Sequence, residues 1–116
     1  MRGRSKYNAR RTTVDGVTFD SASEAQRWGE LKLLQQAGVI HDLKRQVRYE
    51  LSSQRGVKLG AIVIDFTYVQ DGKPVAEDRK GMLLPLARWK LNHLAADYAF
   101  TVRITRKGKP TEEIAP

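Results

Sequence analysis

Two aspartates and a lysine are positioned to act together, because a tight turn is predicted to join the two strand-like segments that carry them. Asp65 lies in the first segment, and Asp78 and Lys80 lie in the second. Asp71-Gly72 lies between the segments and favours a type I′ turn, which needs positive φ at both central positions. Counting outward from this turn places Asp65 opposite Asp78, with Lys80 on the same face.

Facing carboxylates predict a cation site. Cβ atoms of directly opposed residues lie about 4.5–5.5 Å apart, where like charges destabilise a sheet. At an effective dielectric constant of about 20, Asp65 and Asp78 would repel each other by roughly 3 kcal/mol. A divalent cation reverses this repulsion, and Mg²⁺ prefers hard oxygen ligands. The alternative is a solvated edge hairpin in which the two acids splay apart.

Composition narrows the class of protein. The chain of 116 residues is long enough for one domain with a sizeable core. It contains no cysteine, so a metal site would use oxygen or imidazole ligands. No apolar run is long enough to span a membrane and no signal peptide is evident, so we expect a cytoplasmic protein. The net charge of +8 favours a nucleic acid as partner, without separating DNA from RNA.

The expected organisation is a basic arm, one domain and a tail. Residues 1–13 are polar and are interpreted as a flexible arm that lies along phosphates, or as a solubilising tail. We expect the domain to cover residues 14–105 and a disordered tail to cover 106–116. The basic residues of the arm that are candidates for nucleic-acid binding are Arg2, Arg4, Lys6, Arg10 and Arg11.

The predicted elements favour an α/β fold. In chain order they are a hairpin around residues 15–16, a helix over 21–37, a strand over 43–51, the hairpin of Asp65 and Asp78, a helix over 85–98 and a strand over 100–105. Ser21 and Gly38 fit the two ends of the first helix, and Pro85 fits the first position of the second. We expect a mixed β-sheet with helices on both sides. The apolar run 61–64 predicts a central strand covered on both faces.

The chain resembles the PD-(D/E)xK nuclease superfamily, which includes many restriction endonucleases and some phage Holliday junction resolvases. The resemblance is closest to a small phage-borne family within it and extends from Lys6 to about Leu91. An upstream helix acid, a strand aspartate and an acid-x-Lys motif in this order are its most specific signal. The matching segments are Lys6-Tyr7-Asn8, Phe19-Asp20-Ser21 through Glu24, Glu30-Leu31, Gln46, Ile64-Asp65-Phe66 and Glu77-Asp78-Arg79-Lys80-Gly81.

The resemblance implies a restriction-endonuclease-like core and a role for each matching residue. Asp65 and Asp78 would be metal-binding carboxylates, joined by Glu24 and by the backbone carbonyl of Arg79. Lys80 would orient or deprotonate the attacking water, or stabilise charge on the phosphate. Gln46 matches a recurrent glutamine that would position water or phosphate. The implied cofactor is Mg²⁺, with Mn²⁺ as a possible substitute, and no small-molecule cofactor is implied.

Three positions depart from the family pattern. Ile64 replaces the proline of the motif name, and Val47 follows Gln46 where relatives would have proline. The second acid is Asp78 instead of glutamate, which makes the neighbouring Glu77 a rival. Strand alternation sends Glu77 to the opposite face, so we favour Asp78.

Several of these residues also have a purely structural interpretation. Ser21-x-x-Glu24 is a capping box, in which Glu24 would only cap the first helix, although the two roles are compatible. Lys80 would otherwise be a strand-end lysine. Arg88 and Lys90 are candidates for DNA contact, with a solvated helix face as the alternative.

The aromatic and imidazole side chains are expected to be structural. Trp28 and Trp89 are interpreted as core anchors. His41 and His93 are interpreted as a loop residue and a helix-face residue, since no paired histidine spacing supports a metal site.

The residues and the resemblance together predict a Mg²⁺-dependent DNA endonuclease of the PD-(D/E)xK type. The resemblance further implies that it is phage-encoded and acts on branched duplex DNA as a Holliday junction resolvase, which the small size of the domain also favours. Symmetric cutting of two strands implies a homodimer. No membrane partner is expected. The alternatives are a nucleic-acid-binding module without catalysis and an RNA-binding or RNA-cleaving protein, although no RRM-type aromatic cluster or GxxG clamp supports the latter.

Overall fold

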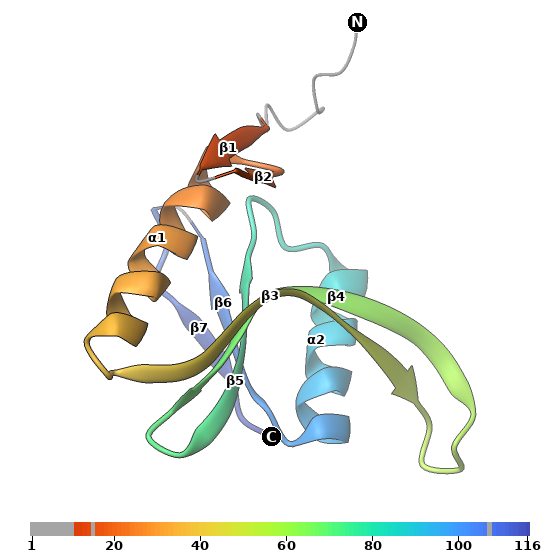
Figure 1. Ribbon diagram of the computed structural model, residues 1–116. Coiled ribbons are helices and arrows are strands. Elements are labelled where there is room, and N and C mark those ends of the chain that lie inside the picture. Colours follow the sequence, from red (N-terminus) through yellow and green to blue (C-terminus); the bar gives the residue numbers. More distant parts are fainter. Residues whose placement is uncertain (1–10, 15, 107) are drawn as a thin grey trace, which may run out of the picture.

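The computed structural model describes residues 11–14, 16–106 and 108–116. Its two sheets and two helices are shown in Figure 1. A two-stranded sheet pairs β1 with β2, and a five-stranded sheet has the order β3-β4-β5-β6-β7. The elements are β1 (Thr12–Val14), β2 (Val17–Phe19), α1 (Ala22–Gln36), β3 (Ile40–Ser52), β4 (Lys58–Gln70), β5 (Lys73–Arg79), α2 (Pro85–Tyr98), β6 (Thr101–Thr105) and β7 (Glu112–Ile114).

Local signals in the sequence place both helices. The Ser21 side chain accepts a hydrogen bond from the Glu24 amide at the start of α1, and Gly38 follows the helix with φ 78°. Pro85 occupies the first turn of α2, where its missing N–H leaves no helical hydrogen bond unmade. The predicted helices over 21–37 and 85–98 are therefore confirmed.

The large sheet is mixed, as predicted. β5 and β6 are parallel, whereas the pairs β3·β4, β4·β5 and β6·β7 are antiparallel. A parallel pair needs a long crossover connection, and α2 supplies it. This α/β arrangement with a mixed sheet and two helices agrees with the predicted fold class at that level.

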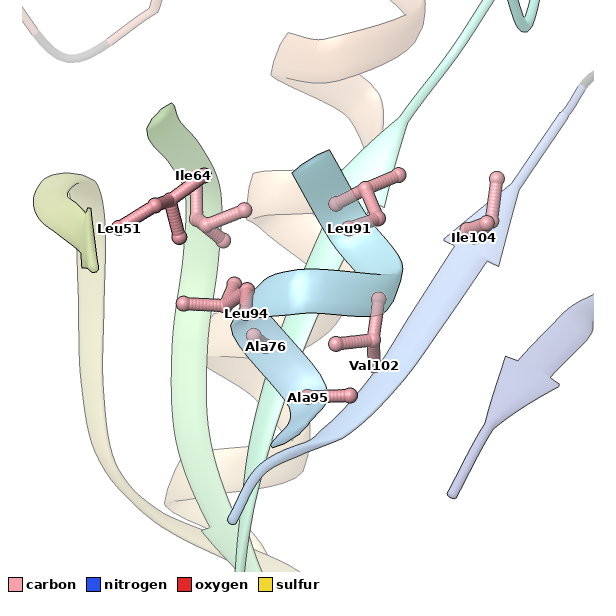
Figure 2. Close-up of a cluster of buried hydrophobic side chains, with 8 residues drawn as sticks. All are labelled: Leu51, Ile64, Ala76, Leu91, Leu94, Ala95, Val102 and Ile104. Carbon is pink, nitrogen blue, oxygen red and sulfur yellow. The ribbon is translucent and has the colours of Figure 1, made fainter. Parts of the chain in front are cut away.

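The two helices pack on opposite faces of the sheet (Figure 1). Successive residues of a strand point to opposite faces. Val75 packs in a cluster with Leu31 of α1, whereas the next residue, Ala76, packs in a cluster with α2. Figure 2 shows the α2 cluster, whose buried residues are Leu51, Ile64, Ala76, Leu91, Leu94, Ala95, Val102 and Ile104.

The long β3–β4 hairpin changes faces in the middle. Ile64 packs in the α2 cluster, but Phe66, two residues later, packs in the α1 cluster. A regular strand would place both on one face. Gln46 lies across from this point with φ 54°, between the pairs Arg45↔Phe66 and Val47↔Ile64. The hairpin is therefore sharply twisted where Gln46 and Asp65 lie.

Three expectations about the tail, the arm and the apolar run 61–64 are wrong. The segment 106–116, predicted to be a disordered tail, contains β7, which pairs with β6. Thr12 and Thr13, assigned to the flexible arm, lie in β1. The run 61–64 is not covered on both faces, because Val63 is 48% exposed. Within the described residues, neither helix is long and apolar enough to cross a membrane.

Candidate metal and nucleic-acid site

Asp65 and Asp78 lie side by side on neighbouring strands. The β4–β5 register runs from Gln70↔Lys73 to Phe66↔Glu77, as predicted from the Asp71-Gly72 turn. The next step along this register brings Asp65 opposite Asp78. There, the Asp65 amide donates a hydrogen bond to Asp78 Oδ1 (3.1 Å), and the Arg79 amide donates one to Asp65 Oδ2 (2.9 Å). These side-chain bonds to backbone amides fix both carboxylates at the end of the strand pair.

Lys80 compensates only one of the two charges. Its ammonium group lies 2.8 Å from Asp78 Oδ2, and its amide donates a hydrogen bond to the Thr105 carbonyl (2.9 Å). Asp78 is almost fully buried, whereas the Lys80 side chain is about a quarter exposed. The backbone of Lys80 is thus fixed to the sheet, and its ammonium group lies at the acid pair. Because the side chain is partly exposed, a ligand from solvent can contact it.

Glu24 joins this group from α1. Its carboxylate is buried and lies 3.8 Å from the Arg45 guanidinium. The Gln46 amide is 3.2 Å from Asp65 Oδ1 and 3.5 Å from Glu24 Oε2, so it bridges the helix acid and the strand acid. The Glu24 amide completes the cap with Ser21, while its carboxylate is directed at the other acids. The Ser21 half of the predicted capping box is therefore present, and the Glu24 carboxylate contacts Gln46 and Arg45.

Burial and mutual repulsion dominate the electrostatics of this acid group. Desolvation, followed by the negative charge of Asp78, raises the pKa of Asp65 to about 9. Burial also raises the pKa of Glu24, against a lowering contribution from its contact with Asp65. When all three acids are ionised, they exceed the positive charge of Lys80 and Arg45 by one unit, which a divalent cation would balance.

The donor set fits a magnesium ion that retains water ligands. In the described ranges, no three carboxylate or imidazole groups form a preassembled cage. Mg²⁺ is usually bound through one or two carboxylates, several waters and substrate phosphates, so Asp65 and Asp78 are the two carboxylates that would hold it. Glu24 would act through water or after a shift of the Gln46 amide. The proposed role of the Arg79 carbonyl stays a prediction.

The neighbouring Glu77 belongs to a different network. It is fully buried, accepts hydrogen bonds from Arg27 Nε (2.6 Å) and Nη2 (3.0 Å), and accepts another from the Tyr68 hydroxyl (2.6 Å). Arg103 in turn donates to the Tyr68 oxygen (2.8 Å). Glu77 thus points away from Asp78, as strand alternation predicted. The Arg27 partner was not predicted, because the two residues lie 50 positions apart.

The predicted nucleic-acid contacts fall into three groups. Arg2, Arg4, Lys6 and Arg10 lie outside the described residues, as does the Lys6-Tyr7-Asn8 motif, and Arg11 is exposed just before β1. Arg88 is bound by Glu112 through both of its terminal nitrogens, so its charge is already neutralised. Lys90 lines an open groove beside the acid group.

The aromatic residues divide in a way that the sequence did not predict. Trp28 is partly buried, packs against the α1 cluster and is stacked on Phe66 at a centroid distance of 6.0 Å, in agreement with its interpretation as a core anchor. Trp89 is 46% exposed, so its assignment to the core is wrong. His93 Nε2 forms a hydrogen bond with the Ser52 carbonyl oxygen (2.8 Å) and lies 3.3 Å from Asp97 Oδ2, consistent with a structural role.

Sequence reasoning missed the groove itself. It lies between residues 61–63 of β4 and the first two turns of α2, and Lys80 and Lys90 are its two basic lining residues. Its apolar lining includes Val63, Leu84 and Leu86, each of which is 48–64% exposed. The only sequence signal was the row of large apolar residues 82–86, which a buried helix start would also explain.

Comparisons with known proteins identify the family. Neither the curated proteins nor the solved structures give a match to this chain. A family model described as "Protein of unknown function (DUF1064)" matches residues 4–111. Because this match covers nearly the whole chain, the protein belongs to the DUF1064 family.

Proposed function

We propose that this protein is a Mg²⁺-dependent DNA endonuclease of the PD-(D/E)xK type. The observation that carries the proposal is the arrangement of Asp65, Asp78 and Lys80 at the end of the β4–β5 pair, with the ion pair of Lys80 and Asp78 at 2.8 Å. The order of α1, the antiparallel β3–β5 strands, the α2 crossover and parallel β6 supports a restriction-endonuclease-like core.

The chain's own residues would share the work of phosphodiester hydrolysis. Asp65 and Asp78 would hold the metal, which supplies an activated water and stabilises the leaving oxygen when bound. Lys80 would stabilise the charge that builds on the non-bridging oxygens of the phosphate, since it lies beside the acids and remains accessible. Gln46 would orient a water between Glu24 and Asp65, the two acids that it bridges.

The substrate that we propose is branched duplex DNA, cut by a homodimer of this chain in the cytoplasm of a phage-infected host. The net charge of +8 supports a polyanionic substrate. One small catalytic domain suits recognition of DNA shape better than of base sequence, and a two-fold dimer would cut both strands of a Holliday junction.

The direct test is cleavage of a labelled four-way junction beside a linear duplex of matched sequence. Each substrate is incubated with Mg²⁺, with Mn²⁺ and with EDTA, for the wild-type protein and for Asp78→Asn. We expect cleavage that needs the metal, prefers the junction and is lost in Asp78→Asn. Cleavage that persists in EDTA or in Asp78→Asn would refute the metal mechanism, and equal cleavage of both substrates would refute the junction preference.

A DNA-binding module without catalysis is the second candidate. The observation that favours it is the Gln46 amide, which lies between Glu24 and Asp65 where a cation would need space. Under this hypothesis, Asp65→Asn and Asp78→Asn retain or increase DNA affinity, and no substrate is cut by the wild-type protein with Mg²⁺ or Mn²⁺. Metal-dependent cleavage by the wild type would exclude it.

A further inference from the structure

The groove beside the acid group has a composition that is unusual for a surface facing paired DNA. It lies between residues 61–63 of β4 and the start of α2, and its lining combines Lys80 and Lys90 with exposed aliphatic side chains. Val63 is 48%, Leu84 48% and Leu86 64% exposed. Exposed apolar side chains gathered in one place indicate a contact with a ligand.

The groove is continuous with the proposed catalytic group. Lys80 both lines the groove and forms the ion pair with Asp78, and Val63 precedes Asp65 by two residues on β4. A nucleic-acid strand with a phosphate at Lys80 would therefore have its neighbouring nucleotides in the groove. Lys90, one turn after Leu86 on α2, would meet a second phosphate.

The apolar lining selects against a continuous duplex. In a duplex the base faces are stacked inside, and the outer surface that meets a protein is dominated by charged phosphates and sugars. Placing phosphates against Leu84 and Leu86 would remove them from water without a hydrogen-bond partner, which is unfavourable. An unpaired nucleotide instead offers a base face for the leucines while its phosphates reach the lysines.

We propose that this groove binds unpaired nucleotides next to the phosphate that is cut, so that the substrate is DNA with an unstacked strand at the cleavage site, such as a branch point. The inference rests on the proposed nuclease function for the position of the cut. The charge of the groove favours DNA as its occupant over a second, equally basic copy of the chain.

The test measures DNA binding in EDTA, where no cleavage occurs. A fluorescent DNA with an unpaired tract at a branch and a fully paired duplex of matched sequence are titrated with wild type, Leu86→Ser and Leu33→Ser. Leu33 is a matched control, because it is 66% exposed and lies on α1 on the other side of the sheet. Urea unfolding of each variant checks that the fold is retained.

We expect Leu86→Ser to weaken binding of the unpaired DNA about fivefold, since apolar contact area is lost, and to leave duplex binding unchanged. Leu33→Ser should match wild type on both DNAs. Equal losses on both DNAs, or no loss on either, would overturn the proposal. So would a wild-type dimer that Leu86→Ser converts to a monomer in sedimentation with DNA binding intact, because the groove would then bind a second copy.

The two proposals fail separately. If wild type prefers the unpaired DNA in EDTA and loses that preference in Leu86→Ser, but Mg²⁺ gives no cleavage, the groove assignment stands and the nuclease function fails. If Mg²⁺ gives cleavage that Leu86→Ser leaves unchanged on both DNAs, and binding in EDTA is also unchanged, the nuclease stands and the groove assignment fails.

Discussion

Glu77 and Asp78 are neighbours on β5, both buried, yet their surroundings are opposite. Glu77 accepts three hydrogen bonds from Arg27 and Tyr68, so its charge is paired and its oxygens are satisfied. Asp78 faces a second carboxylate, Asp65, with Lys80 as the nearby cation. A single step along a strand separates an acid whose charge is paired by Arg27 from an acid that lies against a second carboxylate, Asp65, whose pKa burial and the charge of Asp78 raise to about 9. Burial alone therefore does not distinguish the two acids, whereas the balance of charges around each carboxylate does.

The first prediction distinguishes Asp78 from Glu77 by their effects on activity. We expect Asp78→Asn to lower Mg²⁺-dependent cleavage by about 10³-fold, because the loss of a metal-binding carboxylate removes several kcal/mol of transition-state stabilisation. Folded Glu77→Gln should cleave at nearly the wild-type rate. Single-turnover cleavage of the four-way junction measures both. A large loss in Glu77→Gln, with its fold intact, would break the distinction between the two acids.

The second prediction concerns stability, where we expect the Glu77 substitution to have the larger effect and the Asp78 substitution the smaller one. Glu77→Gln leaves Arg27 without its buried partner, and we expect the free energy of unfolding to fall by about 2–3 kcal/mol, less than for a fully buried pair because Arg27 is partly exposed. Asp78→Asn removes a repulsion and should be neutral or stabilising. Urea unfolding measures both. Glu30→Gln is the matched control, since its pair with Arg27 is exposed and should contribute less than about 1 kcal/mol.

The third prediction uses pH to titrate the acid group. The pKa of Asp65 is raised from 3.8 to about 9, so between these values the folded protein binds a proton that the unfolded chain does not. Without metal, the contribution of Asp65 to stability is therefore present below about pH 4 and is lost as the pH rises toward 9, by at most about 1.4 kcal/mol per pH unit.

Urea unfolding at pH 5, 7 and 9 tests this prediction. The samples are wild type in EDTA, wild type with Mg²⁺ and Asp65→Asn in EDTA. Asp65→Asn should remove this part of the pH dependence. Mg²⁺ should oppose the loss, because a bound cation favours the carboxylate, and its stabilising effect should grow with pH. The assigned electrostatics would be contradicted if the free energy of unfolding of the wild type in EDTA rises from pH 5 to 9 and Asp65→Asn shows the same pH dependence.

The fourth prediction, with the smallest effect, compares two basic residues of α2, Arg88 and Lys90, in DNA binding. Arg88 is paired with Glu112, whereas Lys90 lines the groove. We expect Lys90→Gln to reduce the salt dependence of DNA binding by about one phosphate contact, and Arg88→Gln to leave it nearly unchanged. Binding of the junction at several salt concentrations in EDTA measures the two slopes. If the slope falls equally in both variants, Arg88 contacts DNA despite its pairing with Glu112.

The sequence predicted best where a local rule acts. The Asp71-Gly72 turn determined the β4–β5 register, and the register brought Asp65 opposite Asp78. Alternation along β5 separated Asp78 from Glu77. It predicted poorly where a residue's environment comes from distant segments: Trp89 is exposed, Val63 is uncovered and Glu112 lies in a strand that was expected to be a tail.

The turns and the helix ends could be predicted from the sequence, because they depend on the conformational preferences of a few adjacent residues. Which charges are paired, in contrast, becomes visible when the chain is folded. Arg27 reaches Glu77 across 50 positions, and Gln46 comes between Glu24 and Asp65 at the twist of the β3–β4 hairpin. Such pairings depend on the packing of the helices and the twist of the sheet, and electrostatic energies depend on the distances and burial that this packing creates.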